Sequence, residues 1–337
     1  MNRTLDDVSI ILVTYKGDEM TKHCLNSLKQ TCGQDPQVVV VDNSPSETTR
    51  HIVASYPNAV YVPSPGNPGF AGGNNRALPF CNREYILLLN NDTIVHSRES
   101  IEQLAAFLDT HPKCGAAQGS GRLFQAGNTL AGCGSFLTPM GFMWSPGFNR
   151  DNDPVYDQTH PCFAVSGFFM MFRRSLIQKV GGFLFRSHFW CYYEETDFCH
   201  RIWLSGNEVW YVKTAPIDHL CGATSSQFKH SDIMARYLKN LLFSLNANLS
   251  FWSRMRIMPI CKTLLLGHSL FHLIKGHIDV FKSDWKAMLR SRNEKARSII
   301  ARRQAKLMRK VSDHEIFKTI LRRPPATHLF KYFRSNA

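Results

Sequence analysis

The sequence predicts an α/β fold, and three features of the chain support this class. Short apolar runs that are typical of buried strands alternate with segments of helical periodicity. Polar residues follow each apolar run, at the point where a strand would end. The 337 residues are enough for one large domain with an appendage, or for two domains. Strand–helix alternation of this kind predicts a parallel sheet with right-handed crossovers.

The alternation is clear in the first 62 residues. Residues 8–13 (VSIILV) and 38–41 (VVVV) are apolar, β-branched runs that predict strands buried on both faces. Residues 61–62 predict a short third strand. Between the first two runs, residues from about 19 to 30 have helical spacing. The residues on the apolar side of that helix are Met20, Cys24, Leu25 and Leu28.

Two carboxylates stand where buried strands are predicted to end. Asp42 follows the second strand, and it can hydrogen-bond a ribose or a base edge, or cap a helix that begins near Ser46. Asp92 follows the apolar run 86–89 (ILLL). A carboxylate there can hold a divalent cation against a diphosphate, because ligands of open α/β sheets bind beyond the carboxyl ends of the strands. The alternative is a simple turn or a helix cap.

A glycine-rich segment, residues 66–75 (GNPGFAGGNN), precedes the strand that ends near Asp92. Such a loop ahead of a helix can let backbone N–H groups approach a phosphate. The segment matches neither a P-loop nor a GxGxxG fingerprint. The alternative is a flexible connecting loop.

The middle of the chain predicts a helix, a loop-rich cleft and a further strand. Residues 100–108 have helical periodicity, and residues 115–160 are rich in Gly, Pro and aromatic residues. We expect the latter to form short strands and loops that shape a substrate cleft. Residues 165–174 resume a strand-like run that includes Ser166 and Gly167, and residues 181–183 end the helix that follows.

A second group of acidic residues lies in an aromatic segment. Glu194, Glu195 and Asp197 follow the run FWCYY, and helical spacing continues beyond them. Carboxylates beside aromatic rings can have raised pKa values and act as general bases. Acidic residues are also favoured in the first turn of a helix, and both explanations can hold together. A further strand is predicted at residues 209–212, and His219 follows shortly after it. A lone histidine of this kind is more often structural or exposed than a metal ligand.

The positive charge is concentrated at one end of the chain. Residues 1–228 contain 17 Lys and Arg against 20 Asp and Glu, whereas residues 229–337 contain 23 against 6. This asymmetry predicts a neutral catalytic body and a basic part that meets an anionic surface.

Ten scattered cysteines without CxxC pairs predict neither a zinc module nor a disulfide framework, and the N-terminus has no apolar signal core. We therefore expect a cytoplasmic setting.

The basic third predicts mostly helices over residues 233–310. Residues 257–281 are apolar but interrupted, so we expect no clean spanning helix there. Residues 284–310 mix large apolar residues with many Lys and Arg, which is typical of a helix lying in an anionic membrane surface. The alternative is a helical subdomain packed on the catalytic body. His268 and His272 are spaced to face one way on a helix, but no neighbouring acid in the sequence completes a metal site.

Five segments in one order resemble family 2 glycosyltransferases, most closely the bacterial rhamnosyltransferase-like branch. They are VSIILVTYKG, VVVVDNS, NPGFAGGNN, YILLLNNDT and GGF…YYEETDFCHRIWLSGNEVWYV…DHLCGATS, within residues 8–225. The resemblance implies the GT-A fold with a mixed central sheet and inverting transfer from a nucleoside diphosphate sugar. It implies a catalytic domain over residues 1–228, with the nucleotide sugar bound by about 1–110 and the acceptor by about 111–228. Residues 229–337 form a basic helical extension.

The resemblance also implies roles for single residues. Glu195, the second member of the acidic pair with Glu194, would be the base. Asp92 and His219 would hold Mn²⁺ or Mg²⁺. Residues predicted to bind substrate are Thr14, Tyr15, Asp42, Asn43, Gly72, Asn74, Asn75, Asn91, Ser166 and Gly167. Two positions depart from the family pattern, because Glu195 and Leu184 stand where the family usually has Asp.

The implied substrates are a dTDP- or UDP-sugar, with L-rhamnose from dTDP-rhamnose as the first expectation, and a polyprenyl-diphosphate-linked glycan acceptor in O-antigen or cell-wall biosynthesis. That acceptor predicts peripheral contact with the inner face of the cytoplasmic membrane. Galactosyl or N-acetylglucosaminyl transfer, a degenerate protein that binds nucleotide sugar without transfer, and a nucleotidyltransferase or nucleotide-sugar hydrolase are alternatives. A nucleic-acid binder is disfavoured, since the basic residues lack interleaved aromatic residues.

Overall fold

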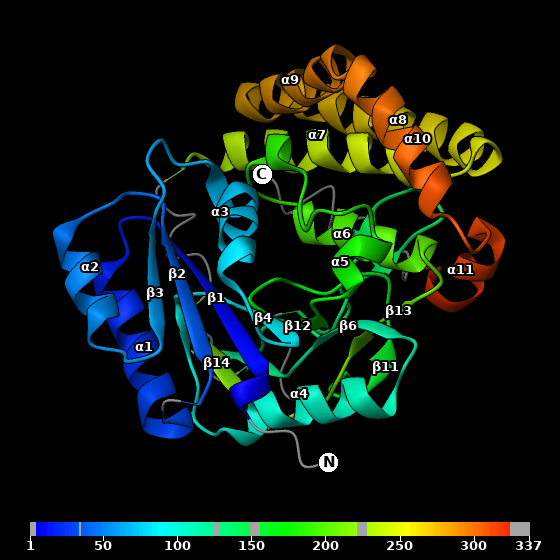
Figure 1. Ribbon diagram of the computed structural model, residues 1–337. Helices are drawn as coiled ribbons and strands as arrows, with labels where there is room; N and C mark the ends of the chain where they lie inside the picture. Colours follow the sequence, from blue (N-terminus) through cyan, green and yellow to red (C-terminus); the bar gives the residue numbers. More distant parts are fainter. Residues whose placement is uncertain (1–4, 34, 125–128, 149–155, 221–227, 324–337) are drawn as a thin grey trace.

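The protein is built on a mixed eight-stranded sheet. The computed structural model describes residues 5–33, 35–124, 129–148, 156–220 and 228–323 (Figure 1). Four strands at one side of the sheet are parallel, in the order β3, β2, β1 and β4. Their bounds are Ala59–Pro63, Gln37–Asp42, Val8–Thr14 and Tyr85–Leu89. The predicted strands, and the parallel pairing of this half, are confirmed.

The other half of the sheet changes direction at β12. This strand, Phe169–Arg173, is antiparallel to both neighbours, β4 and β6 (Cys114–Gln118). Next to β6 lie β13 (Glu208–Tyr211), which is parallel to it, and then β11 (His160–Pro161), which is antiparallel to β13. The mixed central sheet implied by the resemblance is therefore confirmed. Ser166 and Gly167 precede β12 and are not part of it, which corrects the sequence-based strand.

Both faces of the sheet are covered, as the uninterrupted apolar strands predict. Alternate residues of β2 enter two different apolar clusters, with Val38 and Val40 in one and Val39 and Val41 in the other. Helices α1 (Asp18–Cys32), α2 (Glu47–Ala54) and α4 (Glu99–Thr110) supply residues to the first cluster. Helices α3 (Gly69–Ala77), α5 (Leu176–Lys179) and α6 (Glu194–Leu204) supply residues to the second. Ser46 caps α2 by accepting from Thr49 N at 3.0 Å, so the predicted start is confirmed.

The glycine-rich segment is mostly helix and not loop, which corrects the sequence-based expectation. Gly69 begins α3, and the segment's later glycines and asparagines lie within that helix. The glycines serve close packing there. A Cβ on Gly73 would lie 2.7 Å from the Val13 side chain, and one on Gly69 would lie 2.1 Å from the Trp190 carbonyl oxygen. The small size of these residues lets α3 approach β1 and the segment before α6.

Smaller sheets lie beside the main one. The strands β5 (Thr93–Ile94), β14 (Ile217–His219), β7 (Gly121–Leu123) and β8 (Thr129–Leu130) form one of them, in that order. In it, His219 pairs with Thr93 across antiparallel strands. A two-stranded sheet joins β9 (Phe136–Leu137) and β10 (Met143–Trp144). Together with short 3-10 turns at Leu5–Asp7, Leu78–Phe80 and Ser187–Phe189, these elements complete the body.

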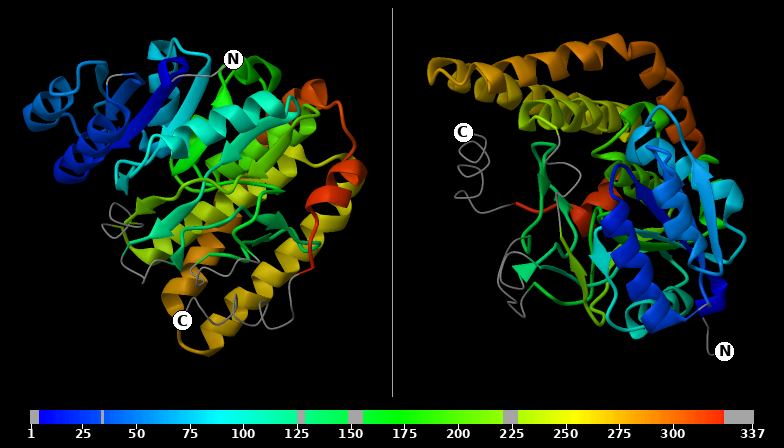
Figure 2. Two further views of the ribbon diagram at one scale, coloured as in Figure 1. Left: turned by 90° about the horizontal axis from the view of Figure 1, so that it is seen from below. Right: turned by 90° about the vertical axis from the view of Figure 1, so that its left-hand side faces the viewer.

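The basic third forms a helical layer over one side of the body (Figures 1 and 2). Helix α7 (His230–Asn248) packs on α6, and α8 (Phe251–Ile274), α9 (Ile278–Asn293) and α10 (Lys295–Met308) lie around it. Helix α11 (Asp313–Ile320) returns to the body. Leu241 and Leu245 of α7 share one apolar cluster with Phe198 of α6. The predicted helical character is confirmed, and one face of the layer packs on the body, as the alternative interpretation expected.

Helix α8 bears on the expectation that this region has no clean spanning helix. Within the described part of the chain it is the one helix that is long and apolar enough to cross a membrane, judged by length and composition alone. Its best 18-residue window has a mean hydropathy of 1.4. Of this apolar stretch, 39% is buried inside the protein, and Pro259 lies within the helix. A helix packed on the body can have the same length and composition as one that spans a membrane. The expectation that residues 257–281 form no clean spanning helix is not decided by this finding and stays a prediction.

A buried carboxylate joins the layer to the body. Asp197 of α6 is fully buried, and it accepts hydrogen bonds from Arg186 at 3.0 Å and Arg201 at 3.0 Å. Ser244 and Asn248 of α7 also donate to it, at 3.0 and 2.8 Å. Burial alone would raise the pKa of Asp197, but the two guanidinium groups outweigh it and hold that pKa well below its usual range. The carboxylate is therefore charged, and three segments depend on it.

We predict that Asp197→Asn destabilises the protein by roughly 3–5 kcal/mol, the usual cost of leaving buried charges without their partner. Urea unfolding followed by circular dichroism measures this. The matched control is Asp35→Asn, because Asp35 forms an exposed ion pair with Arg98 and such pairs contribute about 1 kcal/mol or less. Equal unfolding midpoints for the two variants would contradict the prediction.

Candidate active site

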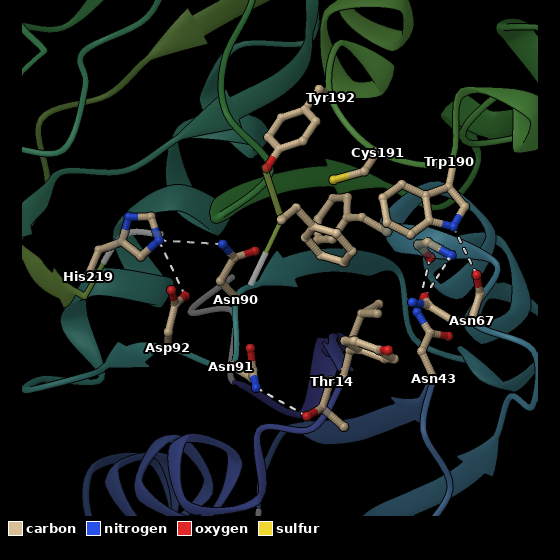
Figure 3. Close-up of a pocket in the computed structure, with 15 residues that line it drawn as sticks. Thr14, Asn43, Asn67, Asn90, Asn91, Asp92, Trp190, Cys191, Tyr192 and His219 are labelled. Carbon is tan, nitrogen blue, oxygen red and sulfur yellow. Dashed lines mark hydrogen bonds and ion pairs between the residues drawn. The ribbon is translucent and has the colours of Figure 1, made fainter. Parts of the chain in front are cut away.

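One pocket lies at the carboxyl ends of the parallel strands, where the sequence places the predicted nucleotide site. It encloses about 290 Å³. Figure 3 shows its residues converging from β1, the loop after β4, the start of α3 and the segment before α6. The residues that line it are Val13, Thr14, Tyr15, Asn43, Asn67, Gly69, Phe70, Asn90, Asn91, Asp92, Trp190, Cys191, Tyr192, His219 and Phe228.

Hydrogen bonds between strand ends shape one wall of the pocket. The Asn91 amide donates to Thr14 Oγ1 at 3.2 Å and to Thr21 Oγ1 at 3.1 Å. Asn43 donates its side-chain amide to Gly69 O at 3.1 Å and its backbone N–H to Thr14 O at 2.8 Å. The Asn43 Oδ1 atom is buried and has no protein donor among the described residues. A ligand N–H group would satisfy this acceptor.

Asp92 and His219 face each other at the other side of the pocket. His219 Nε2 lies 3.3 Å from Asp92 Oδ1, although the two residues are far apart in the sequence. The pairing of β14 with β5 brings them together, and Leu220 N donates to Asp92 O at 2.9 Å. The Phe168 ring stacks on the imidazole with centroids 4.6 Å apart and so fixes its plane.

This pair fits a divalent cation. Asp92 Oδ1 is buried and accepts no hydrogen bond from the described residues. Two ligand atoms 3.3 Å apart can both reach one ion, since each metal–ligand distance is about 2.1 Å. The described residues contain no group of three or more His, Cys, Asp or Glu that could hold a metal. Further ligands would have to come from the substrate or water, as Mg²⁺ sites commonly require.

The acidic pair begins α6, directly after the pocket wall. Glu195 accepts a hydrogen bond from the Gly167 backbone, while its Oε2 and that of Glu194 are buried without a hydrogen bond from the described residues. Burial raises the pKa of both carboxyls, and the charge of Glu195 adds to the rise at Glu194. Cys191, which lines the pocket, lies close enough for both carboxylates to contribute to the raised pKa of its thiol, after burial.

Several predicted substrate-binding residues do not line this pocket. Asp42 is fully buried and accepts from Ser44 N, Ser46 N and the Tyr61 hydroxyl, so its carboxylate holds the start of α2, as the capping alternative expected. Burial, together with that hydrogen bond, raises the pKa of Tyr61 to about 12. The nucleoside contact of Asp42 stays a prediction without support from these contacts.

The residues predicted from the glycine-rich segment also lie outside the pocket. Asn74 donates to Phe70 O at 2.9 Å within α3, and Asn75 exchanges hydrogen bonds with the backbone of Phe185. The amides of these two residues serve the fold, and Gly72 packs against Pro68. Of the predicted pair before β12, Ser166 is exposed, whereas Gly167 lies between Glu195 and the ring of Phe70, which lines the pocket.

Sequence reasoning missed the aromatic wall formed by Trp190 and Tyr192. Both residues and the next one, Tyr193, have left-handed backbone angles, with φ of 64°, 70° and 74°. Three such non-glycine residues together are costly, and strain of this kind clusters at ligand sites. The Trp190 indole donates to Asn67 O at 2.9 Å, and its carbonyl accepts from Ala71 N at 3.0 Å. The aromatic run FWCYY, which precedes the acidic pair, is the sequence feature that could have indicated this wall.

Asn240 holds this wall in place, and no feature of the sequence indicates its role. Its amide on α7 is fully buried and donates to the carbonyl oxygens of Phe189 at 3.1 Å, Cys191 at 3.3 Å and Tyr192 at 2.6 Å. One turn earlier on α7, the Arg236 guanidinium lies 4.2 Å from the Trp190 ring centroid. The helical layer therefore fixes the backbone that leads into the acidic pair.

Comparison with known proteins identifies the family. The family described as glycosyl transferase family 2 matches residues 9–181. The chain belongs to this family. Two curated relatives agree. The low-salt glycan biosynthesis hexosyltransferase Agl10 of Haloferax volcanii is 30% identical over 207 residues, which are 58% of this chain and 62% of that protein. The O-antigen chain rhamnosyltransferase WbaN of Salmonella anatum is 22% identical over 189 residues, 52% of this chain and 55% of that protein. The chain thus spans less than two thirds of either relative.

Solved structures of other glycosyltransferases show the same fold. The mannosyltransferase PcManGT from Pyrobaculum calidifontis, in complex with GDP-Man and Mn²⁺, has a TM-score of 0.51 at 14% identity and covers 86% of each chain. Residues 1–349 of S. aureus TarS, in complex with UDP-GlcNAc, have a TM-score of 0.53 at 16% identity over 89% of this chain and 90% of that one. The predicted family and the GT-A fold are confirmed.

We predict that Asn240→Asp lowers turnover of a nucleotide sugar roughly 10²-fold, because a carboxylate facing three carbonyl oxygens displaces the wall and a shift of about 1 Å at a reacting group has that effect. Release of nucleoside diphosphate measures it, with thermal unfolding recorded in parallel. Asn82→Asp, at an exposed position, is the matched control. Wild-type turnover in a folded Asn240→Asp protein would contradict the prediction.

Proposed function

We propose that this protein is an inverting glycosyltransferase that moves a sugar from a nucleoside diphosphate sugar to a lipid-linked glycan. The observation that carries the proposal is the arrangement of one pocket. An Asp92–His219 pair stands at one side of it. Glu195 does not line the pocket, but it lies in the first turn of α6, shortly after the aromatic wall in the chain, and has an oxygen free of hydrogen bonds from the described residues. Family membership supports the reaction class.

The donor nucleotide occupies the part of the pocket between β1 and α3 in this proposal. Thr14 and Tyr15 line that part, and the unsatisfied Asn43 Oδ1 can accept from a base N–H group. Asp92 and His219 would hold a divalent cation, Mn²⁺ or Mg²⁺. When bound, such an ion neutralises charge on the departing diphosphate. Mn²⁺ beside GDP-Man in the mannosyltransferase from Pyrobaculum calidifontis supports this use of the site.

Glu195 acts as the base. Its carboxylate takes the proton of the acceptor hydroxyl as that oxygen forms a bond to the anomeric carbon, and the bond from that carbon to the diphosphate oxygen breaks on the opposite side. A single displacement inverts the anomeric centre, and no covalent enzyme intermediate forms. Gly167 N–H orients the carboxylate. Glu in place of Asp extends the reach of the base by one methylene.

For the donor we propose L-rhamnose from dTDP-rhamnose, and for the acceptor a polyprenyl-diphosphate-linked glycan in surface polysaccharide biosynthesis. The name of one relative, an O-antigen chain rhamnosyltransferase, supports rhamnose as the sugar and a surface polysaccharide as the product. The hexosyltransferase name of the other relative supports a hexose such as galactose or N-acetylglucosamine as the second candidate.

A lipid-linked acceptor requires contact with a membrane, and we propose that the helical layer makes that contact at the inner face of the cytoplasmic membrane. Eighteen large apolar residues are exposed in the described part of the chain, and 15 of them lie between Phe251 and Leu307. Exposed apolar residues in a strongly basic region are typical of a surface that lies on anionic lipid. The division of the chain near residue 228 into a catalytic body and this layer remains part of the proposal.

The first experiment is a panel of dTDP-, UDP- and GDP-sugars, with and without a membrane-lipid extract, in which release of nucleoside diphosphate is followed. We expect release from one donor that requires lipid extract and is abolished by a metal chelator. Release that needs no acceptor would indicate a hydrolase. Binding of a donor with no release from any would favour a nucleotide-sugar-binding protein without transferase activity.

We predict that Glu195→Gln lowers turnover by about 10²–10⁴, the usual contribution of a general base, and leaves donor affinity unchanged. Because burial raises the pKa of Glu195, and only the deprotonated carboxylate is a base, wild-type turnover should fall with decreasing pH already above the usual carboxyl range. This acid limb should be absent from the residual activity of Glu195→Gln. The control is Glu47→Gln, on the exposed surface. Near-normal turnover of Glu195→Gln would exclude this residue as the base.

A further inference from the structure

A groove in the helical layer has the composition of a site for an anionic amphiphile. It lies between α7, α8, the end of α9 and the start of α10, and it encloses about 830 Å³. Apolar side chains form much of it, three cations line it, and the remaining residues are polar and uncharged. The lining residues are Leu242, Phe243, Asn246, Arg254, Met255, Met258, Pro259, Lys262, Ser291, Asn293, Lys295 and Ser298.

No acidic side chain balances these cations among the described lining residues. The acid nearest in sequence, Glu294, is directed elsewhere, because it forms ion pairs with Lys239 at 3.5 Å and Arg297 at 3.6 Å. A second pocket in the layer, between α7 and α9, differs in this respect, since Asp279 and Asp284 line it. A lining whose described residues include cations and no acid therefore distinguishes the groove from this second pocket.

Two arginines lie at the groove: Arg254 lines it, and Arg302 contacts Asn246, which lines it. Burial, together with the charge of Arg302, lowers the pKa of Arg254. Arg302 donates to Asn246 Oδ1 at 3.1 Å, and Asn246 lines the groove. The Arg254 guanidinium lies 5.8 Å from the ring centroid of Phe251. Guanidinium groups are well suited to bind a phosphate, because each can donate bidentate hydrogen bonds to its oxygens.

We propose that this groove binds the phosphate headgroup of an anionic membrane lipid, with the headgroup at Arg254 and Arg302 and the hydrocarbon along Met255 and Met258. The apolar lining favours a lipid over a free phosphate, which needs no such surface. The groove is also continuous with the exposed apolar surface, because Met255 is 56% exposed and Ile299 follows the lining residue Ser298. The proposal rests on the membrane contact proposed above and adds a defined lipid site to it.

The test measures binding of the full chain to vesicles by flotation. The vesicles are phosphatidylcholine alone, or phosphatidylcholine with phosphatidic acid. The groove variant is Arg254→Gln/Arg302→Gln. Its control, Lys282→Gln/Arg303→Gln, removes the same net charge from exposed positions of α9 and α10 outside the groove lining. A second groove variant, Lys262→Gln/Lys295→Gln, changes only exposed side chains, so it serves if the arginine variant does not fold.

We expect the wild type to float only with phosphatidic acid, either groove variant to lose about tenfold or more in affinity, and the control to lose clearly less. Equal losses in groove and control variants would overturn the lipid site and leave a diffuse membrane contact. Competition by millimolar inorganic phosphate as strong as that by short-chain phosphatidic acid would also overturn it, in favour of a free-phosphate site. A wild type that does not float would refute the membrane contact itself, while the donor panel would still decide the sugar transfer.

Discussion

The buried carboxylate of Asp197 is the interaction on which the active-site half of the molecule depends. Two arginines and two α7 side chains converge on it. Arg201 also donates to Val180 O at 2.7 Å and to Phe183 O at 3.1 Å, and to Leu184 O. A charge this deep is tolerated only when every lone pair is used, and here that requirement aligns α6, the 180–186 segment and α7. Leu184, a departure from the family pattern, contributes its carbonyl to this arrangement.

The two sides of the active site are built by different means. The side proposed for the donor rests on strand ends, where Thr14, Asn43 and Asn91 hydrogen-bond one another across neighbouring strands. The side proposed for the acceptor rests on strained backbone, where three aromatic residues in left-handed conformations precede the acidic pair. That strain persists because the surroundings enforce it, chiefly through Asn240 and the close approach of α3 at Gly69.

This difference explains what could be predicted from the sequence. Strands and their polar ends are local signals, so the β1, β2 and β4 strands, the positions of Thr14, Asn43 and Asp92, and the helix of the acidic pair were predictable. The long-range contacts were not. Nothing local joins His219 to Asp92, or Asn240 to the carbonyls of residues 189–192, because each depends on how distant elements pack. Only the family resemblance indicated His219. The prediction of a loop in the glycine-rich segment was wrong for a related reason. Its glycines allow close packing against β1 and Trp190, and these long-range contacts cannot be predicted from the sequence.

Helix α7 connects the active site with the proposed lipid groove. Arg236, Asn240, Ser244 and Asn248 recur every four residues, so they form one stripe, which contacts Trp190, the 189–192 backbone and Asp197. Leu242 and Asn246 lie on a different face and line the groove. From Arg236 to Asn246 the helix rises roughly 15 Å. The pocket wall and the groove are therefore held by two faces of the same helix, at different heights along it. In the proposed arrangement, the helix that holds the 189–192 backbone would also set the distance between the membrane surface and the acceptor hydroxyl.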